Sequence, residues 1–160
     1  MYIAERYWGE YIGGSDDSLT LLDHLAAKGR EEITVGEVLA AFGLDRLEGN
    51  FRQPEEPLFC TDEEGNEAAI CCAIDLITGL AALLLECDKS GSLDTGELEM
   101  DTPLPAIRLT ASPADRGLLV AALRDFAACP MDYDLSEMVP EEDMKAMAAQ
   151  CGALAEELAE

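Results

Sequence analysis

An apolar stretch from Ala68 to Leu85 limits what this chain can fold into more than any other feature. It reads AAICCAIDLITGLAALLL and is almost long enough to cross a membrane as a helix. However, Asp75 interrupts it, and acidic residues flank it on both sides without a positively charged anchor. We therefore expect the stretch to lie at the centre of a hydrophobic core, as a strand over 69–73 followed by a helix over 75–87.

The chain as a whole is strongly acidic. Of its 160 residues, 34 are Asp or Glu and 10 are Lys or Arg, which gives a net charge of −24, while hydrophobic residues make up 49%. That apolar fraction is sufficient for one folded domain over residues 1–160. The charge argues against nucleic acids and anionic membranes as partners, because both attract basic surfaces. It favours a basic protein, a polyamine or metal ions, and solubility alone is the alternative explanation.

Capping residues mark the beginnings of several helices. Ser15 precedes a first turn with two acidic residues, Thr34 and Glu37 have the spacing of a capping box, and Ser112 precedes a proline. A last helix is expected to begin near Pro140. Its apolar residues recur at helical spacing, which is typical of a core-facing stripe: Met144, Met147, Ala148, Cys151, Leu154, Ala155 and Leu158.

Strand signals are fewer and shorter than helix signals. Residues 105–112 alternate in polarity, and residues 57–74 predict a hairpin that turns at 64–66. The aromatic residues among 1–14 make that segment a further strand candidate. We therefore predict a single domain of the α+β class, in which a small, mostly antiparallel sheet is covered by about five helices.

Cysteine and histidine usage predicts no cofactor. The six cysteines show no C-x-x-C spacing, and His24 is the one histidine, so a structural zinc site is poorly supported. The first ten residues lack the basic region and apolar run of a signal peptide. We expect reduced thiols and a cytoplasmic protein.

The segment DKSGSLDTGELE resembles a calcium-binding EF-hand loop in part. With Asp88 at the first of the twelve loop positions, the side-chain ligands would be Asp88, Ser90, Ser92 and Glu99. Leu93 stands where the loop requires glycine, and Thr95 stands where it requires an apolar residue. We favour a polar turn that follows a helix, and calcium binding remains the alternative.

Catalytic motifs are weakly represented. The chain has no G-x-S-x-G elbow and no cysteine-centred signature. His24 falls inside the first predicted long helix, where an enzyme would have to use it as a base. Carboxylate pairs also perform acid–base chemistry, but so many are present that the sequence distinguishes none of them. We expect no enzymatic activity, with an unrecognised enzyme as the alternative.

Two segments, YIGGSDDS and MDYDLSEMVPEEDM, mix aromatic, apolar and acidic residues. Such mixtures are typical of protein-binding surfaces. The structural alternatives, which we favour, are a tight turn into a capped helix for the first segment and a solvated approach to the last helix for the second. In the first segment, Asp16 and Asp17 lie at the start of the predicted helix. They would repel a bound phosphate and attract a cation or a basic side chain of a partner. The candidate partner-binding residues are Trp8, Tyr11, Asp16, Asp17, Asp132, Tyr133, Asp134 and Glu137.

Three stretches carry a family resemblance: residues 8–28, 73–87 and 133–151. They read WGEYIGGSDDSLTLLDHLAAK, AIDLITGLAALLLEC and YDLSEMVPEEDMKAMAAQC. Together they resemble a group of small acidic bacterial proteins, some of which are similar to immunity proteins encoded beside polymorphic or contact-dependent toxins. The resemblance implies a non-enzymatic inhibitor that caps a toxin domain in the producing cell. An acidic surface would suit a basic nuclease toxin, and the resemblance assigns no contact residue.

Overall fold

Helices account for most of the structure, a computed structural model that describes residues 2–9, 11–28, 32–47, 49–54, 58–61, 65, 67–93 and 106–160. The described α-helices are α1 (Tyr2–Arg6), α2 (Asp16–Lys28), α3 (Val35–Ala41), α4 (Ala73–Ser90), α5 (Pro113–Ala128) and α6 (Glu141–Ala159). Short 3-10 helices follow some of them: η1 (Leu44–Leu47), η3 (Pro130–Asp132) and η4 (Asp134–Glu137). No helix in these described ranges is long and apolar enough to cross a membrane.

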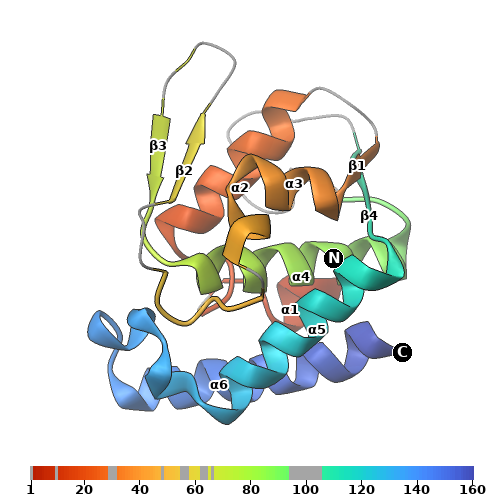
Figure 1. Ribbon diagram of the computed structural model, residues 1–160. Coiled ribbons are helices and arrows are strands. Elements are labelled where there is room, and N and C mark those ends of the chain that lie inside the picture. Colours follow the sequence, from red (N-terminus) through yellow and green to blue (C-terminus); the bar gives the residue numbers. More distant parts are fainter. Residues whose placement is uncertain are drawn as a thin grey trace.

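Helix α4 lies at the centre of the fold. Figure 1 shows α2 and α3 on one side of it and α5 and α6 on the other, and α1 also packs against it. Every residue from Ala73 to Cys87 is buried as a result. The apolar stretch is therefore the centre of the core, as its sequence predicts, with strand β3 (Glu67–Ile70) directly before the helix.

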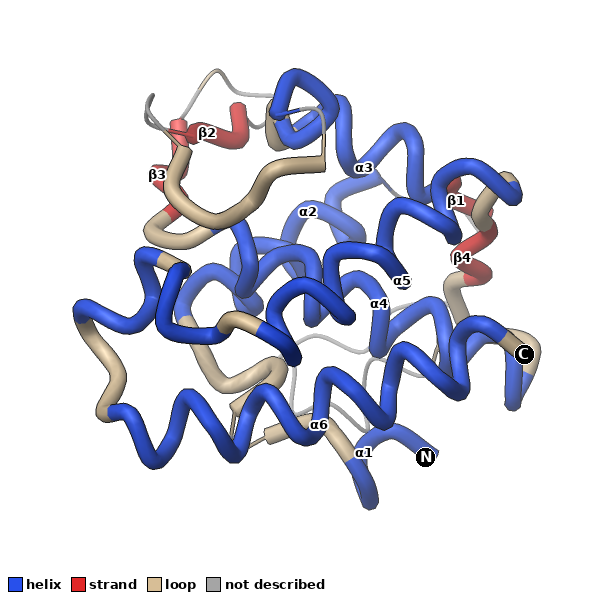
Figure 2. The backbone as a smooth tube through the Cα atoms, turned by 60° about the horizontal axis from the view of Figure 1, so that its bottom comes forward, coloured by secondary structure: helices blue, strands red, loops and turns tan. Residues whose placement is uncertain are grey.

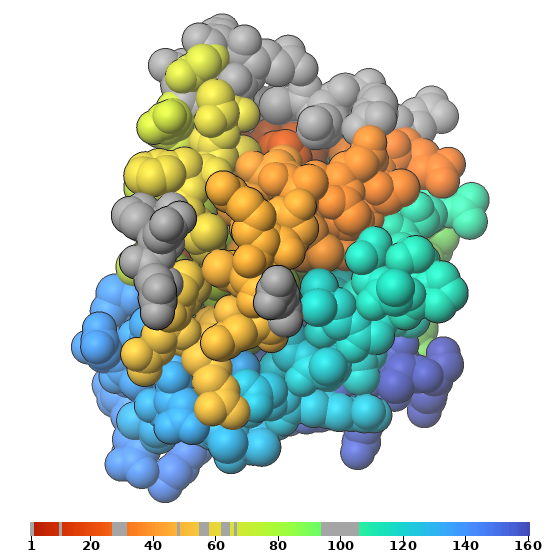
Figure 3. Space-filling view, viewed as in Figure 1, coloured from red at the N-terminus to blue at the C-terminus, as the bar shows by residue number. Residues whose placement is uncertain are grey.

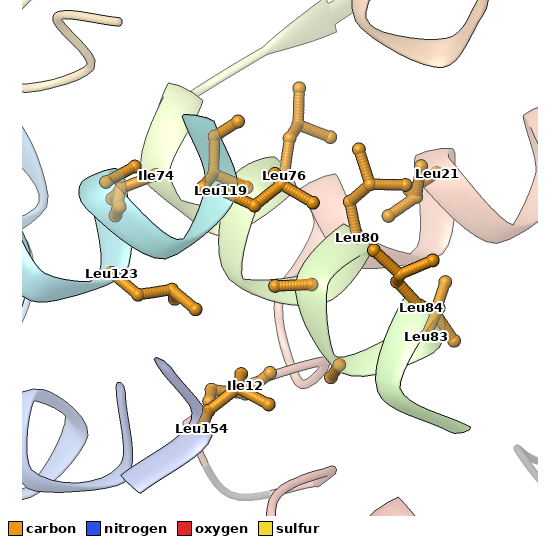
Figure 4. Packing of buried hydrophobic residues seen from close by; sticks show 14 of the residues in the cluster. Ile12, Leu21, Ile74, Leu76, Leu80, Leu83, Leu84, Leu119, Leu123 and Leu154 are labelled. Carbon is orange, nitrogen blue, oxygen red and sulfur yellow. The ribbon is translucent and has the colours of Figure 1, made fainter. Parts of the chain in front are cut away.

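Leucine side chains from four helices meet around α4. Figure 4 shows Leu76 and Leu80 of α4 beside Leu21 of α2 and Leu119 of α5, with Leu154 of α6 on another side. All five are at most 1% exposed. Burial of each such side chain stabilises the fold by about 1.5–3 kcal/mol, so this cluster fixes the positions of the surrounding helices.

The predicted helix caps are confirmed. The Ser15 hydroxyl accepts a hydrogen bond from the Ser18 N–H at 3.2 Å, and Thr34 and Glu37 form a reciprocal capping box. The Ser112 hydroxyl accepts from the Asp115 N–H at 3.1 Å. Each cap satisfies a backbone donor that the helix leaves open, which is why these residues define the helix starts so clearly.

In the described part of the chain, four short strands form two separate two-stranded sheets. Strand β1 (Glu32–Thr34) pairs in parallel with β4 (Arg108–Thr110), and β2 (Leu58–Thr61) pairs antiparallel with β3. The two paired strands of the predicted hairpin and the strand within 105–112 are thus present, and the α+β class is confirmed. Residues 64 and 66 of the predicted turn lie outside the described residues. The two pairs lie on opposite sides of α3 in Figure 1.

The assignment of residues 1–14 as a strand candidate was wrong, because Tyr2–Arg6 form helix α1 and Trp8 and Ile12 form an isolated bridge outside any strand. The Ile3 N–H at the start of α1 donates to the buried carboxylate of Glu86, at 3.1 Å. The hydroxyls of Tyr2 and Tyr7 donate to Glu157 of α6, and Figure 2 shows α1 beside that helix. These partners lie far away in sequence, so local patterning did not reveal them.

Candidate partner-binding site

A buried carboxyl group lies at the beginning of the central helix. Asp75 belongs to the first turn of α4 and is 6% exposed, because neighbouring elements enclose this helix. The N-terminal end of a helix favours a negative charge, and Ser15 adds a hydrogen bond to the Asp75 carboxyl. Asp75 is thus an ionisable group placed deep in the protein.

A second carboxylate caps the same helix from a neighbouring element. Asp17 of α2 accepts hydrogen bonds from the backbone N–H groups of Cys71 and Cys72, each at 2.9 Å. Cys72 is the N-cap residue of α4 and makes no side-chain capping bond itself. Asp17 is 3% exposed, so this predicted partner-binding residue holds α2 against the start of α4.

A third carboxyl group approaches from η4. The Asp134 N–H donates to the carbonyl oxygen of Arg52 at 2.8 Å, and one buried carboxyl oxygen of Asp134 has no hydrogen-bond partner in the described part of the chain. Burial raises the pKa of Asp134. Burial, and then the negative charges of Asp17 and Asp134, raise the pKa of Asp75 to about 7. The site therefore concentrates acidic groups in a weakly solvated environment.

A surface pocket leads to Asp75. Its volume is about 270 Å³. Gly14 and Pro140 at its lining are exposed, so the pocket opens to solvent. The Tyr11 hydroxyl donates to Asp143 at 3.3 Å and thereby links the segment before α2 to the first turn of α6. The lining residues are Tyr11, Gly14, Ser15, Asp75, Leu135, Val139, Pro140, Asp143 and Met147.

An arginine holds the segment beside the pocket in place. Arg52 donates to both oxygens of Asp125, at 2.9 and 2.6 Å, and more weakly to Asp132 at 3.4 Å. The Tyr133 hydroxyl donates to Asp125 at 2.6 Å. In Figure 3 the orange segment that follows α3 covers the middle of one face and reaches the blue residues of the C-terminal third. These bonds fix the turn from which η4 begins.

The predicted partner-binding residues divide into buried and accessible ones. Tyr133 is 1% exposed and packs edge-to-face on Phe126, so it lies in the core, as Asp17 does. Trp8 is half-buried over Gly13, where a Cβ atom would lie 2.3 Å from the indole ring. Tyr11 lines the pocket and Asp134 lies near Asp75, whereas Asp16, Asp132 and Glu137 are exposed.

The proposed calcium ligands are partly engaged elsewhere. Asp88 lies inside α4 and forms a two-bond ion pair with Arg116, at 2.6 and 3.0 Å. The Ser90 hydroxyl donates to Glu86 at 3.0 Å, and Gly91 ends the helix with φ +86°. Glu99 lies outside the described residues. In the part of the chain that is described, no three His, Cys, Asp or Glu side chains are grouped to hold a metal ion.

His24 lies within the fold and away from the pocket lining. Its Nδ1 atom is 3.6 Å from the Cys60 sulfur, and its ring meets Phe42 edge-on with centroids 5.2 Å apart. These contacts join α2 to β2 and to the end of α3. They give the histidine a packing role in the structure.

Sequence reasoning missed Asp75 and Asp143 as site residues. Asp75 was read as an interruption of the apolar run, and Asp143 as one of many acids near the C-terminus. The available signal was an acidic residue inside the apolar stretch of residues 68–85, because such a residue must be buried with the stretch. Its proximity to Asp17 and Asp134 depends on tertiary packing.

Fold and site together define a small, acidic α+β protein with a carboxyl-lined surface pocket. The chain belongs to the Immunity protein 68 family, whose model matches residues 2–158. This match confirms the resemblance to immunity proteins of toxin systems. Searches of curated proteins and of solved structures returned no match.

Proposed function

We propose that this protein neutralises a cognate toxin domain in the cytoplasm of the producing cell by binding it, without catalysing a reaction. The observation that carries the proposal is the family match over nearly the whole chain. The net charge of −24 supports a basic surface on the partner. Electrostatic attraction of this kind speeds association by roughly 10 to 10³-fold, which suits an inhibitor that must act before its toxin does.

A nuclease domain is the toxin class that we favour. Its substrate is a polyanion, so its substrate-binding surface is basic. The carboxylates of this protein would then occupy the positions of phosphate groups. Exposed acids of α2, η3, η4 and α6 provide them: Asp16, Asp132, Glu137, Glu141 and Glu142. Trp8 and Tyr11 would add apolar contact area beside this charged surface.

Coexpression tests the function. The protein is produced with the toxin domain encoded beside it, and survival of the host, copurification and toxin activity are measured. We expect survival, a stable complex and loss of toxin activity. Death of the host with no complex formed would overturn the proposal.

Matched charge reversals test which surface is used. Glu137→Lys with Glu142→Lys alters the surface near the pocket, whereas Glu5→Lys with Glu156→Lys makes the same change in charge elsewhere. Glu156 lies about 22 Å along α6 from its first residue, at 1.5 Å per residue. We expect the first pair to slow association with the toxin domain much more than the second pair does. Equal effects would move the interface away from the pocket.

A further inference from the structure

We propose that the pocket at the start of α4 receives one basic side chain, lysine or arginine, of the toxin, with the Asp75 carboxylate as its counter-charge. This inference rests on the proposed function and deepens it. The proposed function gives only the overall charge of the interface, whereas this inference names one pocket in which a basic side chain of the toxin binds.

The size of the pocket suits one side chain. Its volume of about 270 Å³ lies below the range of about 300–1,000 Å³ that is typical of sites for drug-sized molecules. A pocket of this size would enclose a lysine or arginine side chain but not a large cofactor.

The chemistry of the lining matches a long basic side chain. Leu135, Val139 and Met147 provide an apolar wall for a methylene stem, which lysine and arginine bury readily. Asp75 and Asp143 provide carboxyl groups for the charged end. An uncharged apolar side chain would bring these acids no opposite charge, whereas an acidic one would be repelled.

Among the described residues, no positive charge acts on Asp75. The charges that act on it are those of Asp17 from α2 and Asp134 from η4, both negative, and Ser15 offers a neutral hydrogen bond. The thiol of Cys151 from α6 faces it as well, and burial holds the pKa of this thiol near 12, so it remains neutral. A buried carboxylate is stable when it is paired, and an incoming cation would supply the pair.

Binding of a cation should therefore depend on pH. The pKa of Asp75 is raised to about 7 in the free protein, so the carboxyl must lose its proton before it pairs with a cation. Below about pH 7 the affinity should fall by about tenfold for each pH unit, since one proton is released on binding. Tyr11 and Asp143 also face the pocket, so the effect must be assigned to Asp75 by substitution.

The test uses isotopically labelled full-length protein and small model compounds. Nα-acetyl-lysine methylamide and Nα-acetyl-arginine methylamide carry the charge, and the norleucine compound is their neutral counterpart. Carboxyl and amide resonances are followed by NMR. We expect the charged compounds to shift the signals of the pocket lining and to lower the pKa of Asp75, while norleucine does neither. Equal shifts with norleucine, or no shifts with the charged compounds, would overturn the proposal.

Two variants localise the effect. Asp75→Asn removes the charge and keeps the shape, and Val139→Phe fills the pocket while leaving the charge. Both should lose binding of the charged compounds at least tenfold, whereas Glu156→Gln on the exposed far end of α6 should leave it unchanged. Unchanged binding in Asp75→Asn and Val139→Phe would place the cation elsewhere and refute the inference.

Failure of this inference differs from failure of the proposed function. If the wild type binds the toxin domain and Asp75→Asn binds it equally well, the pocket is not the anchor, although the inhibitor function stands. If the model compounds bind the pocket but the toxin domain does not bind the protein, the proposed function fails.

Discussion

The carboxylate of Asp17 in α2 accepts a hydrogen bond from the backbone N–H of Cys72 at 2.9 Å and so caps helix α4. The bond satisfies a donor at the start of α4, and a second bond from the Cys71 N–H reinforces it. Asp17→Ala should therefore lower the free energy of unfolding by about 1–3 kcal/mol. Urea denaturation measures this change, with exposed Asp16→Ala as the matched control. Equal losses in both variants would show that the cap has no special role.

Asp75→Asn should stabilise the protein at neutral and alkaline pH. The folded state raises the pKa of Asp75 from about 3.8 to about 7, so the unfolded state binds fewer protons between these values. Ionisation of the buried Asp75 carboxyl lowers the free energy of unfolding. This loss is absent below about pH 3.8, grows as the pH rises, and reaches its full size above about pH 7. We expect the free energy of unfolding of the variant to exceed that of the wild type by a few kcal/mol above pH 7. This difference should disappear towards pH 4. A variant that is less stable than the wild type at every pH would contradict this account.

Tyr133→Phe should weaken the attachment of η4. The Tyr133 hydroxyl donates to Asp125 at 2.6 Å, and Asp125 also binds Arg52. Loss of a hydrogen bond to a charged group should cost about 1.5–3 kcal/mol of stability. The hydrogen bonds from Arg52 and then Tyr133 lower the pKa of Asp125 to about 2, so the variant should raise this pKa. An unchanged NMR titration of Asp125 would contradict the role assigned to Tyr133.

The stabilisation that comes from Asp125 also has a predicted pH range. Its folded pKa is depressed from about 3.8 to about 2, so its contribution is complete above pH 3.8 and is lost as the pH falls through 2. Arg52→Ala should remove most of this acid dependence. Acid unfolding curves of the wild type and the variant provide the measurement, and parallel curves would argue against the Arg52–Asp125 pair as its source.

Asp88→Ala separates the structural and calcium-binding interpretations of the segment after α4. Asp88 pairs with Arg116 through two hydrogen bonds, so its loss should lower stability by about 1 kcal/mol whether or not calcium is present. Melting temperatures are measured with calcium, with magnesium and with chelator, and Asp23→Ala, at an exposed aspartate outside this segment, is the control. A stabilisation specific to calcium that disappears in Asp88→Ala would establish calcium binding instead.

Local signals predicted the helix starts well. Ser15, Thr34 and Ser112 accept hydrogen bonds from residues three positions ahead, so both partners of each cap are visible in a short segment of sequence. The buried stripe of α6 was equally predictable, because its period is a property of the helix itself. The α+β class followed from these elements.

The candidate site was less predictable because distant residues create it. Tyr133 was expected at an interface because it is aromatic and stands among acids, yet its partners are Phe126 and Asp125 in α5. Asp17 was expected at the surface, but the open N–H groups before α4 draw it inward. The N-terminal segment became a helix because Glu86 and Glu157 offer partners. Patterns along the chain contain none of these relationships.

Calorimetric titration of the purified toxin domain into the wild-type protein tests the central claim most directly, at low and at high salt concentration. We predict saturable binding at a one-to-one ratio that weakens as salt screens the acidic surface, together with loss of toxin activity in the complex. Absence of binding at low salt, with the toxin fully active in the mixture, would contradict the assignment of this protein as an inhibitor of that toxin.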